Sequence, residues 1–260
     1  MTWYTAVFLG LVQGLAEFLP ISSSGHLLLF ENLFGITDGG LLLTLILHLA
    51  TLLAVVVVYR HRLWQMVRHP WNKETLRLGL ATVITCVMVV LFHDVIDRLF
   101  TVAALPYAFL CAGIYLLVPA VMNCYRRHQI VTKTVSAARP WWQAAAMGLA
   151  QGVAVVPGLS RSGLTITTGR LSGMSGAEST DFSFLMSIPI ILASLVYELC
   201  RGGCEGKLGI GSILLAFVTA FFAGIVAIKI MLEITRKIDL RWFALYLLLL
   251  GAGLLIGSWF

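Results

Sequence analysis

GLVQGLAEFLPISSSG, residues 10–25, recurs 138 positions later as GLAQGVAVVPGLSRSG, residues 148–163. Eight of the sixteen aligned positions are identical, which chance would rarely give, so the chain contains an internal duplication. The first copy carries Glu17 where the second has an apolar residue, and the second carries Arg161 where the first has Ser23. One half therefore offers a carboxylate and the other offers a cation.

The composition indicates a membrane protein, with 59% hydrophobic residues, only 12% charged residues and a mean hydropathy of +0.93. A helix needs about 20 apolar residues to cross a ~30 Å hydrocarbon core. Six stretches are long and apolar enough, at about 41–59, 75–93, 104–122, 180–199, 211–232 and 241–259. We predict an all-α polytopic membrane protein with six transmembrane helices.

The net charge of +6 reflects sorting across the membrane and does not indicate a nucleic-acid partner. Twelve lysines and arginines follow the first, third and fifth spans: Arg60, Arg62, Arg68, Lys73, Arg77, Arg126, Arg127, Lys133, Arg139, Arg236, Lys237 and Arg241. The opposite loops hold three: Arg98, Arg201 and Lys207. This bias places the first set in the cytoplasm. The two repeats then enter the membrane from opposite sides, as an inverted repeat.

Each repeat begins with an apolar helix of about 15 residues, too short to span, which is broken at residues 20–25 or 157–163 by proline, serine and glycine. Broken backbone at membrane depth is tolerated only inside protein or beside water. We therefore predict two re-entrant helix pairs whose breaks meet in the interior. A serine near the start of each following helix leaves free N–H groups at the break, which favours an anion site suited to phosphate.

The two repeats extend over about residues 4–122 and 141–260, and we predict one integral membrane domain, 1–260. No basic segment precedes the first apolar helix, so we expect no cleavable signal peptide. The five cysteines are odd in number and predict neither a disulfide framework nor a metal cluster.

The run QGLAEFLPISSSGH and the later PGLSRSGLT resemble the paired motifs of the bacterial undecaprenyl-diphosphate phosphatase family, the bacitracin-resistance membrane proteins. The resemblance implies hydrolysis of undecaprenyl diphosphate to undecaprenyl phosphate and inorganic phosphate in the inner membrane. That reaction recycles the lipid carrier of peptidoglycan synthesis. The resemblance also implies a site open to the outer face and a divalent cation, Mg²⁺ or Ca²⁺. Many members have glutamate at the position of Gln13, so the metal site here has one carboxylate fewer.

The residues that carry these motifs divide into three predicted groups. The catalytic candidates are Glu17, Ser23, His26 and Arg161; the substrate-binding candidates are Ser22, Ser24, Ser160, Ser162 and Thr165; the metal ligands are Gln13 and Glu17. Gln13 and Glu17 are four residues apart and share one helix face. Arg161 presents a planar fork that matches phosphate oxygens. In our hypothesis Ser23 attacks the terminal phosphorus while His26 takes or returns a proton.

Alternatives remain open for several of these residues. Glu17 pairs structurally with Arg161 in one interpretation, and Gln13 and its counterpart Gln151 bond the broken backbone in another. The serines and Thr165 more often cap helices than react. Attack by His26 itself is an alternative mechanism. Another histidine, His48 in the first span, is interpreted as a packing residue.

Two rival functions fit part of the pattern. A polyprenyl-phosphate transporter or flippase would share the inverted repeats and broken helices, but transport alone does not require the full set of Glu17, Ser23, His26 and Arg161. A type-2 phosphatidate phosphatase needs another histidine after its Ser-Arg pair, and none follows Arg161. We expect a polyprenyl diphosphate substrate and membrane lipids as partners, and no nucleic acid. The sequence leaves open whether the protein forms a homodimer.

Overall fold

The computed structural model describes residues 1–36, 40–126, 140–200, 209–237 and 240–257. Within these ranges the regular structure is helical and no β-strand occurs. The elements are α1 (Trp3–Phe18), α2 (Ser23–Leu33), α3 (Gly40–Arg68), α4 (Lys73–Leu91), α5 (His93–Leu99), η1 (Val102–Ala104), α6 (Leu105–Arg126), α7 (Trp141–Val153), α8 (Arg161–Leu171), α9 (Gly176–Cys200), α10 (Ile210–Lys237) and α11 (Arg241–Gly257). The predicted all-α class is confirmed.

Five of these helices are long and apolar enough to cross a membrane. Four are α3, α4, α9 and α10, and the fifth candidate runs from η1 through most of α6. The chain is therefore a multi-pass membrane protein. The sixth predicted span corresponds to α11, whose 17 residues lie at the short end of the range that can span. Six spans and the re-entrant pairs stay predictions.

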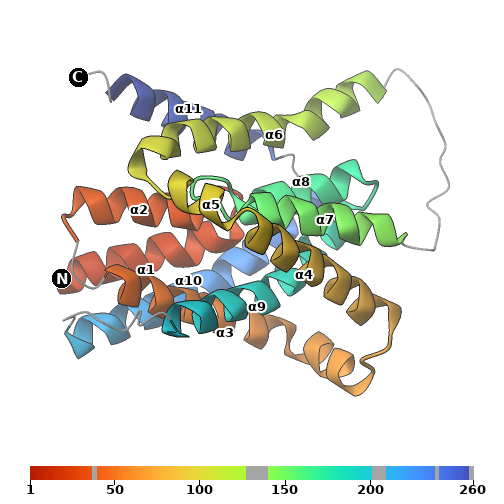
Figure 1. The fold of residues 1–260 in the computed structure, drawn as a ribbon, viewed down its shortest axis with the longest axis horizontal. Coiled ribbons are helices and arrows are strands. Elements are labelled where there is room, and N and C mark those ends of the chain that lie inside the picture. The colour runs from red at the N-terminus through yellow and green to blue at the C-terminus, as the bar shows by residue number, and fades with distance from the viewer. Residues whose placement is uncertain (37–39, 127–139, 201–208, 238–239, 258–260) are drawn as a thin grey trace.

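Helices of each repeat pack against helices of the other repeat (Figure 1). The first helix of repeat one, α1, packs along α10, and its counterpart in repeat two, α7, packs along α4. Helices α4 and α10 occupy equivalent positions in the two repeats. The equivalent helices α6 and α11 lie side by side, and so do α3 and α9. This pattern is the one that a two-fold related repeat requires.

Glycines set how closely the exchanged helices approach. A Cβ atom added to Gly10 of α1 would lie 2.6 Å from the carbonyl oxygen of Ala216 in α10. A Cβ atom added to the equivalent Gly148 of α7 would lie 2.6 Å from the carbonyl oxygen of Ala81 in α4. Small residues let helix backbones pack this tightly where hydrophobic burial gives little drive for association.

The largest hydrophobic cluster lies against the end of α1. Phe18 is fully buried and contacts Phe184 of α9 edge-to-face, with ring centroids 5.3 Å apart. Phe109 and Leu116 of α6 belong to the same cluster. This cluster fixes Glu17, which directly precedes Phe18, in the interior.

Some of the lysines and arginines from which the membrane topology was predicted lie outside the described ranges: Arg127, Lys133, Arg139, Arg201 and Lys207.

Candidate active site

The two serine-rich breaks meet in the structure, as the sequence predicts. The backbone N–H of Gly158, in the second break, donates to Oγ of Ser22, in the first, at 3.1 Å. In the other direction, Oγ of Ser162 donates to the carbonyl oxygen of Leu19 at 3.0 Å. The predicted meeting of the breaks is confirmed, and direct hydrogen bonds hold them together.

A serine caps the helix that follows each break. Ser22 is the N-cap of α2 and accepts from the N–H of Gly25 at 3.4 Å, and Ser160 is the N-cap of α8 and accepts from Gly163 at 3.1 Å. Ser22 has a φ of 70°, a strained conformation for a residue with a side chain, which costs on the order of 1–3 kcal/mol. Its oxygen accepts from both breaks, so hydrogen bonds from both repeats maintain this backbone shape.

The buried carboxylate of Glu17 is hydrogen-bonded to two of the other predicted catalytic residues and to Gln13. Arg161 Nη2 donates to Oε1 at 2.5 Å, while Oε2 accepts from Ser23 Oγ at 2.5 Å and from Gln13 Nε2 at 3.0 Å. Only 6% of the Glu17 side chain is exposed. The structure thus brings Gln13, Glu17, Ser23 and Arg161 together. The ion pair that the sequence offered as an alternative role for Glu17 is formed.

Arg161 is only partly satisfied by this pair. It is the first residue of α8, at the helix N-terminus, and its Nη1 atom is buried with no hydrogen-bond partner among the described residues. A buried donor without a partner is costly, and a guanidinium fork binds carboxylate and phosphate oxygens well. One nitrogen of the fork therefore faces Glu17, and another is available for an anion.

A hollow of about 220 Å³, which includes space open to solvent, lies between the two breaks. Glu17 and Arg161 line it, with the serines of both breaks: Ser22, Ser23, Ser24, Ser160 and Ser162. Four of these serines already bond protein groups, whereas the side chain of Ser24 makes no hydrogen bond within the part of the chain that the structure describes. The hollow combines a cation, hydroxyls and two helix N-termini, which is the chemistry that binds a phosphate group.

Thr165 lies one turn further along α8 and is fully buried. Its hydroxyl donates to the carbonyl oxygen of Arg161 at 2.7 Å and lies 2.6 Å from Oγ of Ser183 in α9. These contacts fix the first turn of α8 against α9. Thr165 therefore supports the backbone that carries Arg161.

His26 is close to the site but is not hydrogen-bonded to Ser23 within the described structure. Its Nδ1 lies 2.7 Å from the carbonyl oxygen of Ser22, and its Nε2 lies 2.6 Å from the hydroxyl of Tyr246. The hydroxyl of Ser23 donates to Glu17 instead. A simple Ser23–His26 pair is therefore not formed, and the nearest proton acceptor for Ser23 is the carboxylate.

Two site residues were not recognised from the sequence. The histidine at position 48, interpreted as a packing residue, presents Nε2 to Glu17 Oε2 at 3.9 Å, with Nδ1 held by the carbonyl oxygen of Thr44 at 2.8 Å. An ionisable residue within an apolar span was the available signal. Tyr246, which contacts His26, lies on α11, and no motif marks it.

The interpretation that the two glutamines bond the backbone of the broken segments is wrong. Gln13 donates to Glu17, and Gln151 donates to the hydroxyl of Thr85 at 3.3 Å and to the carbonyl oxygen of Met186 at 3.4 Å. These partners lie on helices and not in the broken segments.

The oxygen atoms of Gln13 and Glu17 suit one divalent cation whose remaining ligands would come from the phosphates of the enzyme's substrate. Among the described residues, no three acidic, histidine or cysteine side chains gather at one point. Gln13 Oε1, however, is buried there with no hydrogen-bond partner among the residues that the structure describes, and its amide nitrogen bonds the carboxylate of Glu17. Mg²⁺ is commonly held by one or two carboxylates together with substrate phosphates. Gln13 and Glu17 fit that arrangement.

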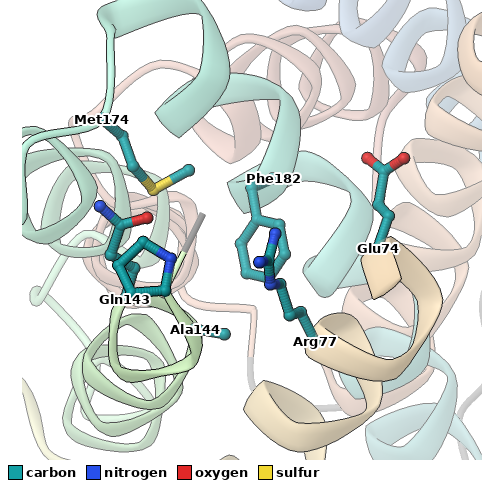
Figure 2. Close-up of a pocket in the computed structure, with 7 residues that line it drawn as sticks. Glu74, Arg77, Gln143, Ala144, Met174 and Phe182 are labelled. Carbon is teal, nitrogen blue, oxygen red and sulfur yellow. The ribbon is translucent and has the colours of Figure 1, made fainter. Parts of the chain in front are cut away.

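A second hollow, of about 300 Å³ including open space, is separate from these residues (Figure 2). It is lined from α4, α7 and α9 and from the segments that precede α7 and α9: Glu74, Arg77, Pro140, Gln143, Ala144, Met174 and Phe182. Glu74 is paired with Arg62, and the guanidinium of Arg77 lies 5.6 Å from the ring centroid of Trp141. None of the predicted site residues lines this hollow.

Comparison with known proteins gives a match over nearly the whole chain. Residues 6–253 match the family described as Bacitracin resistance protein BacA. An undecaprenyl-diphosphatase of Carboxydothermus hydrogenoformans is 36% identical over 98% of this chain and 97% of its own length. Undecaprenyl-diphosphatase 1 of Shouchella clausii is 37% identical over 95% and 93%, and an undecaprenyl-diphosphatase of Treponema denticola is 34% identical over 100% and 98%. The matched residues include both breaks.

Proposed function

We propose that this chain, which belongs to the bacitracin resistance protein BacA family, hydrolyses undecaprenyl diphosphate to undecaprenyl phosphate and inorganic phosphate. The names of its relatives support phosphatase activity over the alternative of transport alone. In this role the protein is a hydrolase that recycles the lipid carrier of peptidoglycan synthesis. Resistance to bacitracin follows from the same activity.

The observation that carries this proposal is the half-satisfied guanidinium of Arg161. Its Nη2 is bound to Glu17, and its buried Nη1 lacks a partner in the described structure. The N-termini of α2 and α8 lie at the same hollow. Phosphoryl transfer depends mainly on positioning and on neutralising charge. A terminal phosphate in the hollow would meet one cation and two positive helix ends.

We assign the nucleophile to Ser23. Its hydroxyl donates to Glu17 Oε2 at 2.5 Å, so the carboxylate is placed to accept the proton as Oγ attacks. The new bond joins Oγ to the terminal phosphorus, and the bridging P–O bond breaks with its electrons leaving on undecaprenyl phosphate. Water then hydrolyses the phosphoserine and releases inorganic phosphate. His26 Nε2 is less suited to attack because the Tyr246 hydroxyl lies against it.

Gln13 and Glu17 would hold the divalent cation, Mg²⁺ or Ca²⁺, with His48 next to them. Such an ion supplies charge neutralisation and orientation to the diphosphate. Arg161 binds terminal oxygens from the opposite repeat, and the serines keep the two helix N-termini directed at the hollow. Ser22, Ser24, Ser160 and Ser162 line the space that the substrate phosphate would enter.

We further propose that the protein lies in the bacterial cytoplasmic membrane with its basic loops in the cytoplasm. The hollow then opens toward the outer face, as the family resemblance implies. The bias of lysine and arginine between alternate loops supports this orientation.

The test is phosphate release from a long-chain polyprenyl diphosphate in detergent, with and without EDTA. Glu17→Ala and Arg161→Ala should abolish release, and EDTA should suppress release by the wild type. The exposed pair Glu233 and Arg236 supplies matched controls, and alanine at either position should leave release unchanged. No release by a folded wild type across several divalent ions would contradict the proposal.

A further inference from the structure

A tyrosine from the second repeat contacts the catalytic histidine candidate of the first. Tyr246 lies on α11 and His26 lies on α2, 220 positions apart in the chain. The Tyr246 hydroxyl is 2.6 Å from His26 Nε2, and the two rings are stacked with centroids 5.7 Å apart and an interplanar angle of 12°. The hydroxyl of the tyrosine therefore meets one nitrogen of the imidazole, and the two ring planes run nearly parallel.

The partners of His26 fix where its proton lies. Nδ1 is 2.7 Å from the carbonyl oxygen of Ser22, which can only accept, so Nδ1 carries hydrogen. In the neutral ring Nε2 is then an acceptor, and the Tyr246 hydroxyl is its donor. The second partner of a histidine nitrogen commonly selects the tautomer and the ring orientation. The ring of Phe109, 5.4 Å away, closes a further side of the imidazole.

Burial makes this hydrogen bond consequential. Only 4% of His26 is exposed, so without the hydroxyl Nε2 would be a buried acceptor with no partner or the ring would have to turn. An unsatisfied buried acceptor is costly, and a turned ring would leave Ser22. Tyr246 is 42% exposed, so the tyrosine can adjust when a substrate enters more readily than the histidine can.

We propose that Tyr246 is a positioning residue, holding His26 in the Nδ1–H tautomer with Nε2 ready to exchange a proton during phosphate release. This inference rests on the proposed phosphatase reaction and adds to it a proton-transfer role for His26, separate from the proton that Glu17 accepts from Ser23. It parallels the ion pair across the breaks. Arg161 of the second repeat holds Glu17 of the first, and Tyr246 of the second repeat holds His26 of the first.

The test compares Tyr246→Phe with Tyr197→Phe. Tyr197 makes the same type of contact, with its hydroxyl 3.0 Å from His93 Nε2, at an exposed position away from the hollow. Tyr246→Phe keeps the stacked ring and removes only the hydroxyl. We expect kcat to fall about tenfold, the effect of leaving one buried hydrogen bond unmade, while KM stays within about twofold because substrate binding is retained. Tyr197→Phe should match the wild type.

A spectroscopic readout separates positioning from general loss of structure. In ¹⁵N-histidine-labelled protein, Tyr246→Phe should move the His26 Nε2 resonance, which His26→Gln identifies by its disappearance. Tyr197→Phe should leave that resonance unchanged. If Tyr246→Phe does not fold, 3-fluorotyrosine at position 246 alters the acidity of the hydroxyl within the same shape and should also move the His26 signal.

Each outcome decides the matter. Wild-type kcat with an unmoved His26 resonance in Tyr246→Phe overturns the positioning role, even if His26→Ala is inactive. A wild-type kcat in His26→Ala overturns it too, because Tyr246 would then act through a residue that the reaction does not need. Loss of release in Ser23→Ala and Arg161→Ala would still support the proposed phosphatase in either case, so the two failures are distinguishable.

Discussion

Replacing Arg161 with alanine removes the cation that lies 2.5 Å from the carboxylate of Glu17. The pair is buried, with 6% of the Glu17 side chain and 15% of the Arg161 side chain exposed. Removing one partner of a buried ion pair costs about 3–5 kcal/mol because the remaining charge is uncompensated. Ser23 and Gln13 still donate to the carboxylate, so we expect about 3 kcal/mol, the lower end of that range.

That loss has a measurable thermal signature. A destabilisation of about 3 kcal/mol should lower Tm on the order of 6 °C or more for a chain of this size. Thermal unfolding in detergent measures the shift. The double variant Glu17→Gln with Arg161→Ala should recover most of the loss, because the neutral amide needs no counter-ion. Arg236→Ala is the control, since an exposed pair contributes only about 0–1 kcal/mol.

Arg161→Lys separates stability from catalysis. Lysine retains the charge and should keep Tm near the wild-type value, but a single ammonium cannot bind Glu17 and a phosphate oxygen with separate, fixed nitrogens. We expect kcat/KM to fall about 10- to 100-fold, the effect of one lost charged hydrogen bond. A wild-type Tm for Arg161→Ala, or no recovery in the double variant, would refute the inference that Glu17 depends on Arg161 for charge compensation.

Three further perturbations test other parts of the site and fold. Gly148→Val should destabilise the protein by about 1–3 kcal/mol, because its side chain meets the α4 backbone, and thermal unfolding measures this; a wild-type Tm would contradict the packing. Gln13→Glu should raise divalent-cation affinity about tenfold or more by adding a carboxylate beside Glu17, and Mn²⁺ titration followed by electron paramagnetic resonance tests it. His48→Ala should lower the same affinity about tenfold, the usual effect of losing a neighbour of the ligands; unchanged Mn²⁺ binding would place His48 outside the cation site.

The helical architecture and the meeting of the breaks were predictable because both depend on local patterns. Apolar length predicts spans, and the repeated glycines and serines mark the breaks. The sequence also placed Ser23 and Arg161 at equivalent positions, and the structure brings both onto Glu17. The predicted span 241–259 corresponds to α11, Arg241–Gly257, over the residues that the structure describes.

The connections between distant helices were not predictable. Tyr246 resembles any aromatic residue of an apolar helix until α11 brings it to His26. His48 of α3 has no motif around it, and its approach to Glu17 depends on how α3 packs beside α1. The direction in which the Ser23 side chain points was also not predictable from the sequence. The chain order suggests a pairing of Ser23 with His26, whereas the hydroxyl in fact turns back to the end of α1.

The most direct test of the central claim is single-turnover release of labelled phosphate from a polyprenyl diphosphate that carries the label in its terminal group. The reaction should be followed in the wild type, Ser23→Ala and His26→Ala, each shown to be folded. We predict rapid release by the wild type, none by Ser23→Ala and slowed release by His26→Ala. Near-wild-type release by Ser23→Ala, with none by His26→Ala, would contradict the serine mechanism.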